Sequence, residues 1–211
     1  MARKFKKSKV SICVFCEGES EQAYIDFLKN EFHDVAVFKR PSSPGLFDDA
    51  DNRFKKDPGY RNYVDAIDEI WFFFDVEEKD IGNWTNRLEI IKRLRKLRKD
   101  PKIRVRLLMT TGCIEYWLML HYRHLAPSLL TVPDKERMLA QVVNMEPTYR
   151  KGNYDATARI AQNYPTAVKN ATIVLQNLLQ EGMPGLEDTD ERNRWLCTKC
   201  KTFSTVHEAI I

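Results

Sequence analysis

Residues 69–80 read EIWFFFDVEEKD, a run of apolar side chains that passes directly into a cluster of acids. The apolar part, residues 70–74, is too short for a typical helix and would give a strand no polar face. Strands of this kind are typical of parallel sheets that helices cover on both sides. The run therefore predicts a doubly covered sheet, with Asp75, Glu77 and their acidic neighbours at the carboxyl end of one strand.

The rest of the first 130 residues alternates in the same way. Short β-forming runs predict strands at residues 10–16, 35–38, 69–74 and 103–109. Apolar residues at helical spacing predict intervening helices: one that Ser20 would cap, a short one at about 61–68, and two at 85–99 and 114–125. Residues 41–60, rich in Pro, Gly, Asp and Asn, are expected to form a long loop. This order predicts a four-stranded parallel sheet flanked by helices.

After residue 133 no strand pattern remains. Helices are expected at 134–145, 155–163, 165–181 and 189–196, with a last one after Ser204. We therefore predict three parts: a basic arm at 1–9, an α/β core at 10–130, and a helical C-terminal extension at 131–211 packed on the core.

Composition limits the class of protein. The chain has 211 residues, of which 43% are hydrophobic and 30% charged, which suits one globular domain with an appendage. No apolar run is long enough to cross a bilayer, and the N-terminus lacks the pattern of a signal peptide. The five cysteines, an odd number, favour a reducing compartment. We expect a cytoplasmic protein with no membrane partner.

Acids follow two of the predicted strands. Glu17 ends the first strand, with Glu19 and Glu21 nearby, and Asp75 and Glu77 end the third. If these strands are neighbours, Glu17, Asp75 and Glu77 converge at one edge of the sheet, where open parallel sheets bind ligands. Clustered carboxylates repel unless a cation neutralises them, and Mg²⁺ prefers such oxygen ligands. The alternative is that these acids are ordinary loop and helix-cap residues with no bound ligand.

Four stretches resemble the RloB-like family, a branch of the Toprim superfamily. They are FCEGESE at 15–21, FFDVE at 73–77, TGCIEYWLMLHY at 111–122 and FSTVH at 203–207, in the family's order and across nearly the whole chain. The third stretch is the most specific. Two positions depart from the family pattern: Glu77 stands where Asp is usual, and Thr111-Gly112 replaces Asn-Pro.

The resemblance implies a Toprim fold that binds Mg²⁺, or Mn²⁺, to break or join phosphodiesters. By this resemblance Glu17 would be a general acid/base or a metal ligand, and Asp75 and Glu77 would be the metal-binding pair. Glu115, which follows the fourth strand at the same edge, is a further acidic candidate. The resemblance also implies a phage-defence role (abortive infection) beside an ATPase partner.

Two neighbours of Glu115 need separate consideration. Trp117 and His121 do not share its helical face, so both are candidates for packing, although a site role for His121 stays open.

Cys13 and Cys16 lie three residues apart in a predicted strand and would face opposite sides, which excludes joint chelation of one ion. Cys197 and Cys200 would supply at most half of a zinc site. No phosphate-binding GxxxxGK[ST] motif is present.

Basic residues are segregated although the formal net charge is only +4. Six of the eight residues at 92–99 are basic, and five more lie in the arm at 1–9. The nucleic-acid candidates on the helix are Lys92, Arg93, Arg95, Lys96 and Lys99. Arg150, Lys151, Lys199 and Lys201 are further basic candidates in the helical half. The alternative is a solvated helix face with no ligand.

Together these features lead us to expect a Mg²⁺-dependent nuclease that acts on DNA or RNA, with tRNA among the RNA candidates. Its catalytic residues would be Glu17, Asp75, Glu77 and Glu115. An alternative is a non-catalytic subunit that keeps the fold and binds an ATPase or nucleic acid. A nucleotidyl transferase of the primase type is a third possibility, but no base-binding pocket is recognisable in the sequence.

Overall fold

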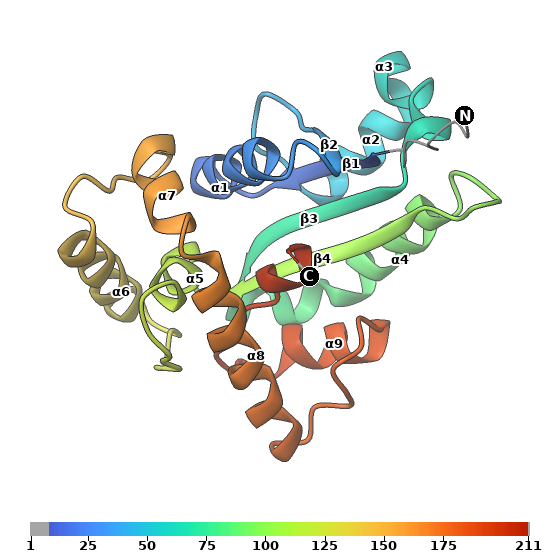
Figure 1. Cartoon of the computed structure of the whole chain (residues 1–211). Helices are drawn as coiled ribbons and strands as arrows, with labels where there is room; N and C mark the ends of the chain where they lie inside the picture. Colours follow the sequence, from blue (N-terminus) through green and yellow to red (C-terminus); the bar gives the residue numbers. More distant parts are fainter. Residues whose placement is uncertain (1–8, 211) are drawn as a thin grey trace, which may run out of the picture.

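A computed structural model describes residues 9–210 as an α/β fold built on one four-stranded sheet (Figure 1). The strands are β1 (Val10–Cys16), β2 (Ala36–Lys39), β3 (Glu69–Val76) and β4 (Arg104–Thr111). They are all parallel, in the order β2-β1-β3-β4. The predicted fold class is confirmed: a parallel four-stranded sheet flanked by helices, followed by C-terminal helices.

Strands β3 and β4 each extend two residues beyond their predicted ends, so that β3 includes Asp75. In the ladder between β3 and β4, Asp75 pairs with Thr110 and Val76 with Thr111. Asp75 is therefore the penultimate residue of its strand rather than part of the following loop. The predicted adjacency of the first and third strands is also confirmed, since Cys16 of β1 pairs with Phe73 of β3.

Each face of the sheet carries its own apolar core. On one face Val14, Cys16 and Phe73 pack with α1 (Glu19–Glu31), α5 (Ile114–Leu120) and further C-terminal helices. On the other face Phe15, Phe72 and Phe74 pack with α2 (Phe47–Lys56), α4 (Trp84–Arg95) and α9 (Asp190–Thr198). Cys13 and Cys16 lie in different cores, so they face opposite sides of the sheet as predicted.

The segment predicted as a long loop at 41–60 contains two helices, α2 (Phe47–Lys56) and α3 (Pro58–Arg61), so that prediction is wrong. The segment is rich in turn-forming residues, but its apolar residues have helical spacing. Phe47, Ala50 and Phe54 recur at spacings of three and four and are buried together. Acids in the first turn of α2 and bases in its last turn also suit the helix dipole.

Other helices differ from the prediction mainly at their ends. The remaining elements are η1 (Val64–Ala66), η2 (Glu78–Asn83), α4 (Trp84–Arg95), α6 (Val132–Met145), α7 (Tyr154–Ala161), α8 (Tyr164–Gln180), α9 (Asp190–Thr198) and η3 (Val206–Ala209). The helix predicted at 85–99 ends at Arg95, and the side chain of Arg98, beyond the helix, donates to the carbonyls of Asp65 and Pro101. The helix predicted at 114–125 ends at Leu120. The expected helices at 61–68 and after Ser204 reduce to short turns of 3₁₀ helix.

The C-terminal helices pack on the sheet layer, and α7 lies beside α1 (Figure 1). The chain then returns to the sheet edge, where Ser204 forms an antiparallel bridge with Thr110 of β4. The predicted boundary between a core at 10–130 and an extension at 131–211 stays a prediction. Of the predicted basic arm, residues 1–8 lie outside the described residues. Among residues 9–210, no helix combines the length and apolarity needed to span a membrane.

Candidate active site

A cavity of about 280 Å³ opens where β1 and β3 end. Its lining consists of Glu17, Gly18, Glu19, Ser20, Glu21, Asp75, Ile114, Glu115 and Lys151. Five of these residues are acidic and one is basic. The acids come from four places: the end of β1, the start of α1, the end of β3 and the start of α5. We call this cavity the acid pocket.

Glu17 ties the two central strands together at their carboxyl ends. Its backbone N–H donates to the carbonyl of Phe73 at 3.0 Å, which continues the parallel ladder by one step. Its carboxylate Oε2 accepts a hydrogen bond of 2.9 Å from the backbone N–H of Asp75. The Glu17 carboxylate is thus held against the backbone of Asp75 at the carboxyl edge of the sheet.

The carboxylate of Asp75 is buried among other acids. Its Oδ1 has no hydrogen-bond partner among the described residues. Burial raises the pKa of Asp75 well above its ordinary value, and the nearby carboxylates of Glu21, Glu17, Glu115 and Glu77 raise it further. Buried acceptors without a partner are rare in folded proteins and costly. This atom is therefore the strongest local indication that a positively charged group belongs in the pocket.

Glu21 enters the pocket from the first turn of α1. Helix α1 begins after Gly18, not at Ser20 as predicted, and a Cβ at Gly18 would lie 2.9 Å from Oε2 of Glu21. Glycine at this position thus lets the Glu21 side chain fold back over the helix start. Burial, together with Glu17 and Glu115, raises the pKa of Glu21 to about 7.

Glu115 enters from the other side, in the first turn of α5, and is 1% exposed. Its Oε1 accepts a hydrogen bond of 3.1 Å from the hydroxyl of Tyr149 and lies 3.9 Å from Nζ of Lys151. Tyr149 is fully buried, whereas the side chain of Lys151 is two-thirds exposed. Tyr149 therefore orients Glu115 from within the core, while Lys151 lies beside it at the surface.

Tyr149 and Lys151 lie in the turn between α6 and α7, and this turn is docked onto α1. The backbone N–H of Gly152 donates to Oγ of Ser20 at 3.1 Å. Gly152 has a φ of 76°, which favours glycine, and a Cβ there would lie 3.0 Å from Oε2 of Glu19. The C-terminal helices thereby complete the pocket that the sheet begins.

Glu77 does not line the acid pocket. Strand β3 ends at Val76, and Glu77 becomes the N-cap of η2, where it forms a capping box with Asp80. Its carboxylate forms ion pairs with Lys135 of α6 and with Lys79. Burial opposes ionisation, but the hydrogen bonds from these lysines prevail and lower the pKa of Glu77. Its assignment to the metal-binding pair stays a prediction.

The donor set of the acid pocket suits a hard divalent cation. In residues 9–210 no set of three or more His, Cys, Asp and Glu side chains is already arranged as a metal centre. Mg²⁺, however, is commonly held by only one or two carboxylates, with waters and substrate phosphates as its other ligands. Glu17 and Asp75 supply such a pair, and the unpartnered Oδ1 of Asp75 supplies a lone pair for it. The residues therefore fit Mg²⁺ or Mn²⁺.

His121 and Trp117 are buried away from the acids that line the pocket. Nε2 of His121 lies 3.1 Å from the hydroxyl of Tyr24, and Nδ1 lies 3.0 Å from the carbonyl of Trp117. Burial lowers the pKa of His121 to about 4, so the ring is neutral at pH 7. These contacts match the packing alternative for both residues.

The basic residues of α4 are largely paired with acids. Lys92 forms a salt bridge with Glu89 and Arg93 forms one with Asp51. Arg95 forms a bidentate salt bridge with Asp190. Lys96 and Lys99, which follow α4, are exposed. A role for this surface in binding nucleic acid stays a prediction.

Three residues in or beside the acid pocket had no assigned role from the sequence. Glu21 was visible only as an acid near Glu17, Lys151 only as one of several bases, and Tyr149 gave no signal. The positions of Tyr149 and Lys151 depend on the turn of Gly152 against Ser20, a contact between residues 132 positions apart. No pattern in a single sequence reports such a contact.

Comparison with protein families gives one match, which spans almost the entire sequence. The family model described as RloB-like protein matches residues 12–210. Comparisons with curated proteins and with solved structures found no match. The matched region includes every residue of the acid pocket. The chain therefore belongs to the RloB-like family.

Proposed function

We propose that this protein is a Mg²⁺- or Mn²⁺-dependent nuclease of the Toprim type. The observation that carries the proposal is the buried Asp75 carboxylate, whose Oδ1 has no hydrogen-bond partner among the described residues and which faces further carboxylates. Membership of the RloB-like family and the position of the acids at the carboxyl edge of a parallel sheet support it.

In this proposal Glu17 and Asp75 would hold the cation. A divalent metal ion bound there would activate water and stabilise the leaving oxygen of a phosphodiester. The hydrogen bond from the Asp75 N–H fixes the Glu17 carboxylate beside β3. Glu115, held by Tyr149, would stand on the far side of the pocket as a further oxygen ligand or an acceptor for bound water.

Two other pocket residues have chemistry that suits phosphodiester cleavage. Glu21, with its pKa raised to about 7 by burial and neighbouring acids, is in the range in which a carboxyl group exchanges a proton with water. Lys151 is an exposed cation 3.9 Å from Glu115, where it would contact a substrate phosphate. The pocket thus combines metal ligands, a proton acceptor and a phosphate-binding cation.

The wider role belongs to the same proposal. The resemblance to RloB-like proteins implies a phage-defence effector that works with an ATPase partner in the cytoplasm. Lys96 and Lys99, with the paired bases Lys92, Arg93 and Arg95 beside them, would provide an electrostatic path for DNA or RNA.

The test is cleavage by the purified full-length chain of supercoiled plasmid and of total tRNA, with Mg²⁺, with Mn²⁺ and with a chelator. We expect metal-dependent cleavage that Asp75→Asn and Glu17→Gln abolish. Asp155→Asn, an exposed acid in the first turn of α7, is the matched control and should cleave normally. Cleavage by Asp75→Asn at the wild-type rate would overturn the proposal. Failure of the wild type to cleave either substrate with either metal would favour the non-catalytic alternative.

A further inference from the structure

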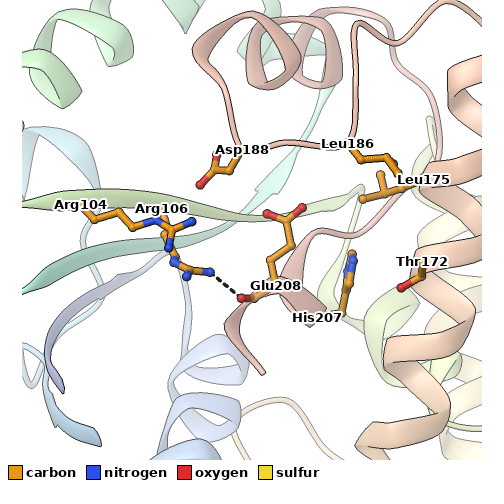
Figure 2. Close-up of a pocket in the computed structure, with 8 residues that line it drawn as sticks. All are labelled: Arg104, Arg106, Thr172, Leu175, Leu186, Asp188, His207 and Glu208. Carbon is orange, nitrogen blue, oxygen red and sulfur yellow. Dashed lines mark hydrogen bonds between the residues drawn. The ribbon is translucent and has the colours of Figure 1, made fainter. Parts of the chain in front are cut away.

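A cavity of about 360 Å³ lies beside β4 and is bounded by α8 and η3 (Figure 2). Two arginines, Arg104 and Arg106, line it together with the carboxylates of Asp188 and Glu208. Nη1 of Arg106 donates to the backbone carbonyl of Glu208 at 2.6 Å. Because opposite charges balance in this lining, the cavity favours no ligand of either sign. The acid pocket differs, since the polar contacts of one wall converge on a single carboxylate, that of Glu115.

Ser20 lies in the first turn of α1 and contributes to that wall. The sequence predicts Ser20 as the N-cap of the helix, but Gly18 occupies the N-cap position. The Ser20 hydroxyl instead accepts a hydrogen bond of 3.1 Å from the backbone N–H of Gly152, in the turn between α6 and α7. Ser20 is 6% exposed, so this contact is largely shielded from water. The hydroxyl therefore connects two segments of the pocket wall.

The Ser20 hydroxyl also lies beside that of Tyr149. Burial raises the pKa of Tyr149, Glu115 raises it further, and a hydrogen bond from Ser20 lowers it. The raising effects prevail, so the Tyr149 hydroxyl keeps its proton at neutral pH and donates a hydrogen bond of 3.1 Å to Oε1 of Glu115. A hydroxyl has only one proton to donate. Ser20 must therefore be the donor in its contact with Tyr149.

These contacts form a directed chain of hydrogen bonds that begins at a backbone amide. The Gly152 N–H can only donate, and it donates to Ser20. Ser20 then donates to Tyr149, whose hydroxyl donates to Glu115. Hydrogen bonds linked in this way polarise and strengthen one another. Loss of the Ser20 hydroxyl would leave the Gly152 N–H without its acceptor and Tyr149 without its donor.

The start of the hydrogen-bond chain is fixed because α7 is attached to α1 at a second point. Nδ2 of Asn30, near the end of α1, donates to the hydroxyl of Tyr154 at 2.7 Å. The Asn153 side chain caps α7 by accepting a hydrogen bond of 3.0 Å from the Ala156 N–H. Gly152 precedes this cap and has a φ of 76°. Its amide is thus held toward α1 by the packing of the two helices.

We propose that Ser20 is a positioning residue of the acid pocket. Through Tyr149 it holds the Glu115 carboxylate in the orientation that phosphodiester cleavage requires, and it acts without contacting the metal ion or the substrate. This role rests on the proposed nuclease function, because it belongs to the same site. The hydrogen-bond chain itself is measurable without any activity, by amide exchange at Gly152.

The kinetic test compares Ser20→Ala with Tyr149→Phe and with the double variant. In metal-dependent cleavage of plasmid and tRNA, Ser20→Ala should lower kcat about 10- to 100-fold with little change in KM, the usual effect of losing a residue that orients a metal-site ligand. The double variant should be no slower than the slower single variant, because both changes release the same carboxylate. Ser128→Ala, an exposed serine between α5 and α6, is the matched control and should cleave as the wild type does.

Hydrogen exchange followed by NMR tests the contact directly. In Ser20→Ala the amide of Gly152 should exchange about fivefold or more faster than in the wild type, the effect of losing one hydrogen bond. Amides of β3 should exchange at their wild-type rates, because the sheet does not depend on this contact. Ser128→Ala should match the wild type at both places.

The outcomes separate the role of Ser20 from the nuclease function. Equal exchange at Gly152 in Ser20→Ala and the wild type would overturn the role of Ser20 even if the protein cleaves nucleic acid. Cleavage by Ser20→Ala at the wild-type rate, or a loss in the double variant equal to the product of the two single losses, would also overturn it and leave the nuclease function standing. Failure of the wild type to cleave would instead overturn the nuclease function, and with it the positioning role of Ser20.

Discussion

The backbone N–H of Asp75 donates a 2.9 Å hydrogen bond to Oε2 of Glu17. This contact joins the ends of β1 and β3 and leaves the Asp75 carboxylate facing Glu21 and Glu115, with one oxygen that has no partner among the described residues. Glu17 thus has one carboxylate oxygen fixed by the sheet backbone. The arrangement gathers like charges at one buried point, which a divalent cation would relieve.

Tyr149→Phe removes the hydroxyl that holds Glu115 and leaves the ring in place. If Glu115 acts in the pocket, the metal-dependent cleavage rate should fall about 10- to 100-fold, the usual effect of losing a residue that orients a metal-site ligand. Steady-state kinetics at saturating metal would measure it. Tyr154→Phe, on the neighbouring helix, is the control. A cleavage rate equal in the two variants would exclude a positioning role for Tyr149.

Lys151→Met removes the exposed cation of the acid pocket. We expect a higher KM and a salt dependence of binding whose log–log slope is smaller by roughly 0.7 to 0.9, the change for one phosphate contact. Lys151→Arg should restore much of the loss, and Lys169→Met, on α8, should behave as wild type. An unchanged KM and slope in Lys151→Met would show that this lysine does not contact substrate.

Glu77→Gln should leave most of the metal-dependent cleavage intact, unlike Asp75→Asn. The reason is that Lys135 and Lys79 already neutralise Glu77, which lies outside the acid pocket lining. Loss of these partly exposed pairs should lower the free energy of unfolding by about 1 kcal/mol or less. Parallel rate measurements on the two variants decide the matter. Equal loss of cleavage in both would restore the metal-pair assignment that the family resemblance implies.

Stability in the presence of a chelator should depend on pH through Glu21. Folding raises its pKa from 4.5 to about 7 because the side chain is buried beside Glu17 and Glu115. Between these values the folded protein keeps a proton that the unfolded chain releases, so the free energy of unfolding falls as pH rises. The effect of one such group is on the order of 1–3 kcal/mol.

Urea unfolding of the wild type and of Glu21→Gln at several pH values measures this effect. The buried His121 and His207, whose pKa values fall to about 4 on burial, act in the opposite direction, but both proteins contain them. The difference between the two proteins therefore reports the ionisation of Glu21 together with its effect on the pKa of Asp75. It should grow from about pH 4.5 to about pH 7 and shrink when Mg²⁺ is added. A difference that does not vary with pH would contradict the raised pKa.

The sheet was predictable because its signals are local. The apolar run at residues 70–74, with acids directly after it, identifies a central strand and its acidic carboxyl end. The helix at Phe47–Lys56 was missed because turn-forming residues dominate its composition, whereas burial of three apolar residues on one face decides its structure. The sequence pattern places Glu77 beside Asp75, but alternation along β3 stops at Val76, where the capping box of η2 begins.

The rest of the acid pocket depends on contacts between distant segments. Glu17 and Asp75 are recognisable because each follows an apolar strand. Tyr149 and Lys151 come from a turn whose position is set by Gly152 against Ser20 and by α7 against α1. The return of the C-terminal segment to β4 at Ser204 is likewise a contact between distant parts of the chain. Neither association leaves a periodic or compositional trace in the sequence.

The most direct test of the central claim is anomalous diffraction from crystals of the full-length protein soaked in Mn²⁺. A peak bounded by the carboxylates of Glu17 and Asp75, and absent from crystals of Asp75→Asn, is the predicted result. Absence of a peak at that point in the wild type, or a peak that persists unchanged in Asp75→Asn, would contradict the assignment of a metal-dependent active site to the acid pocket.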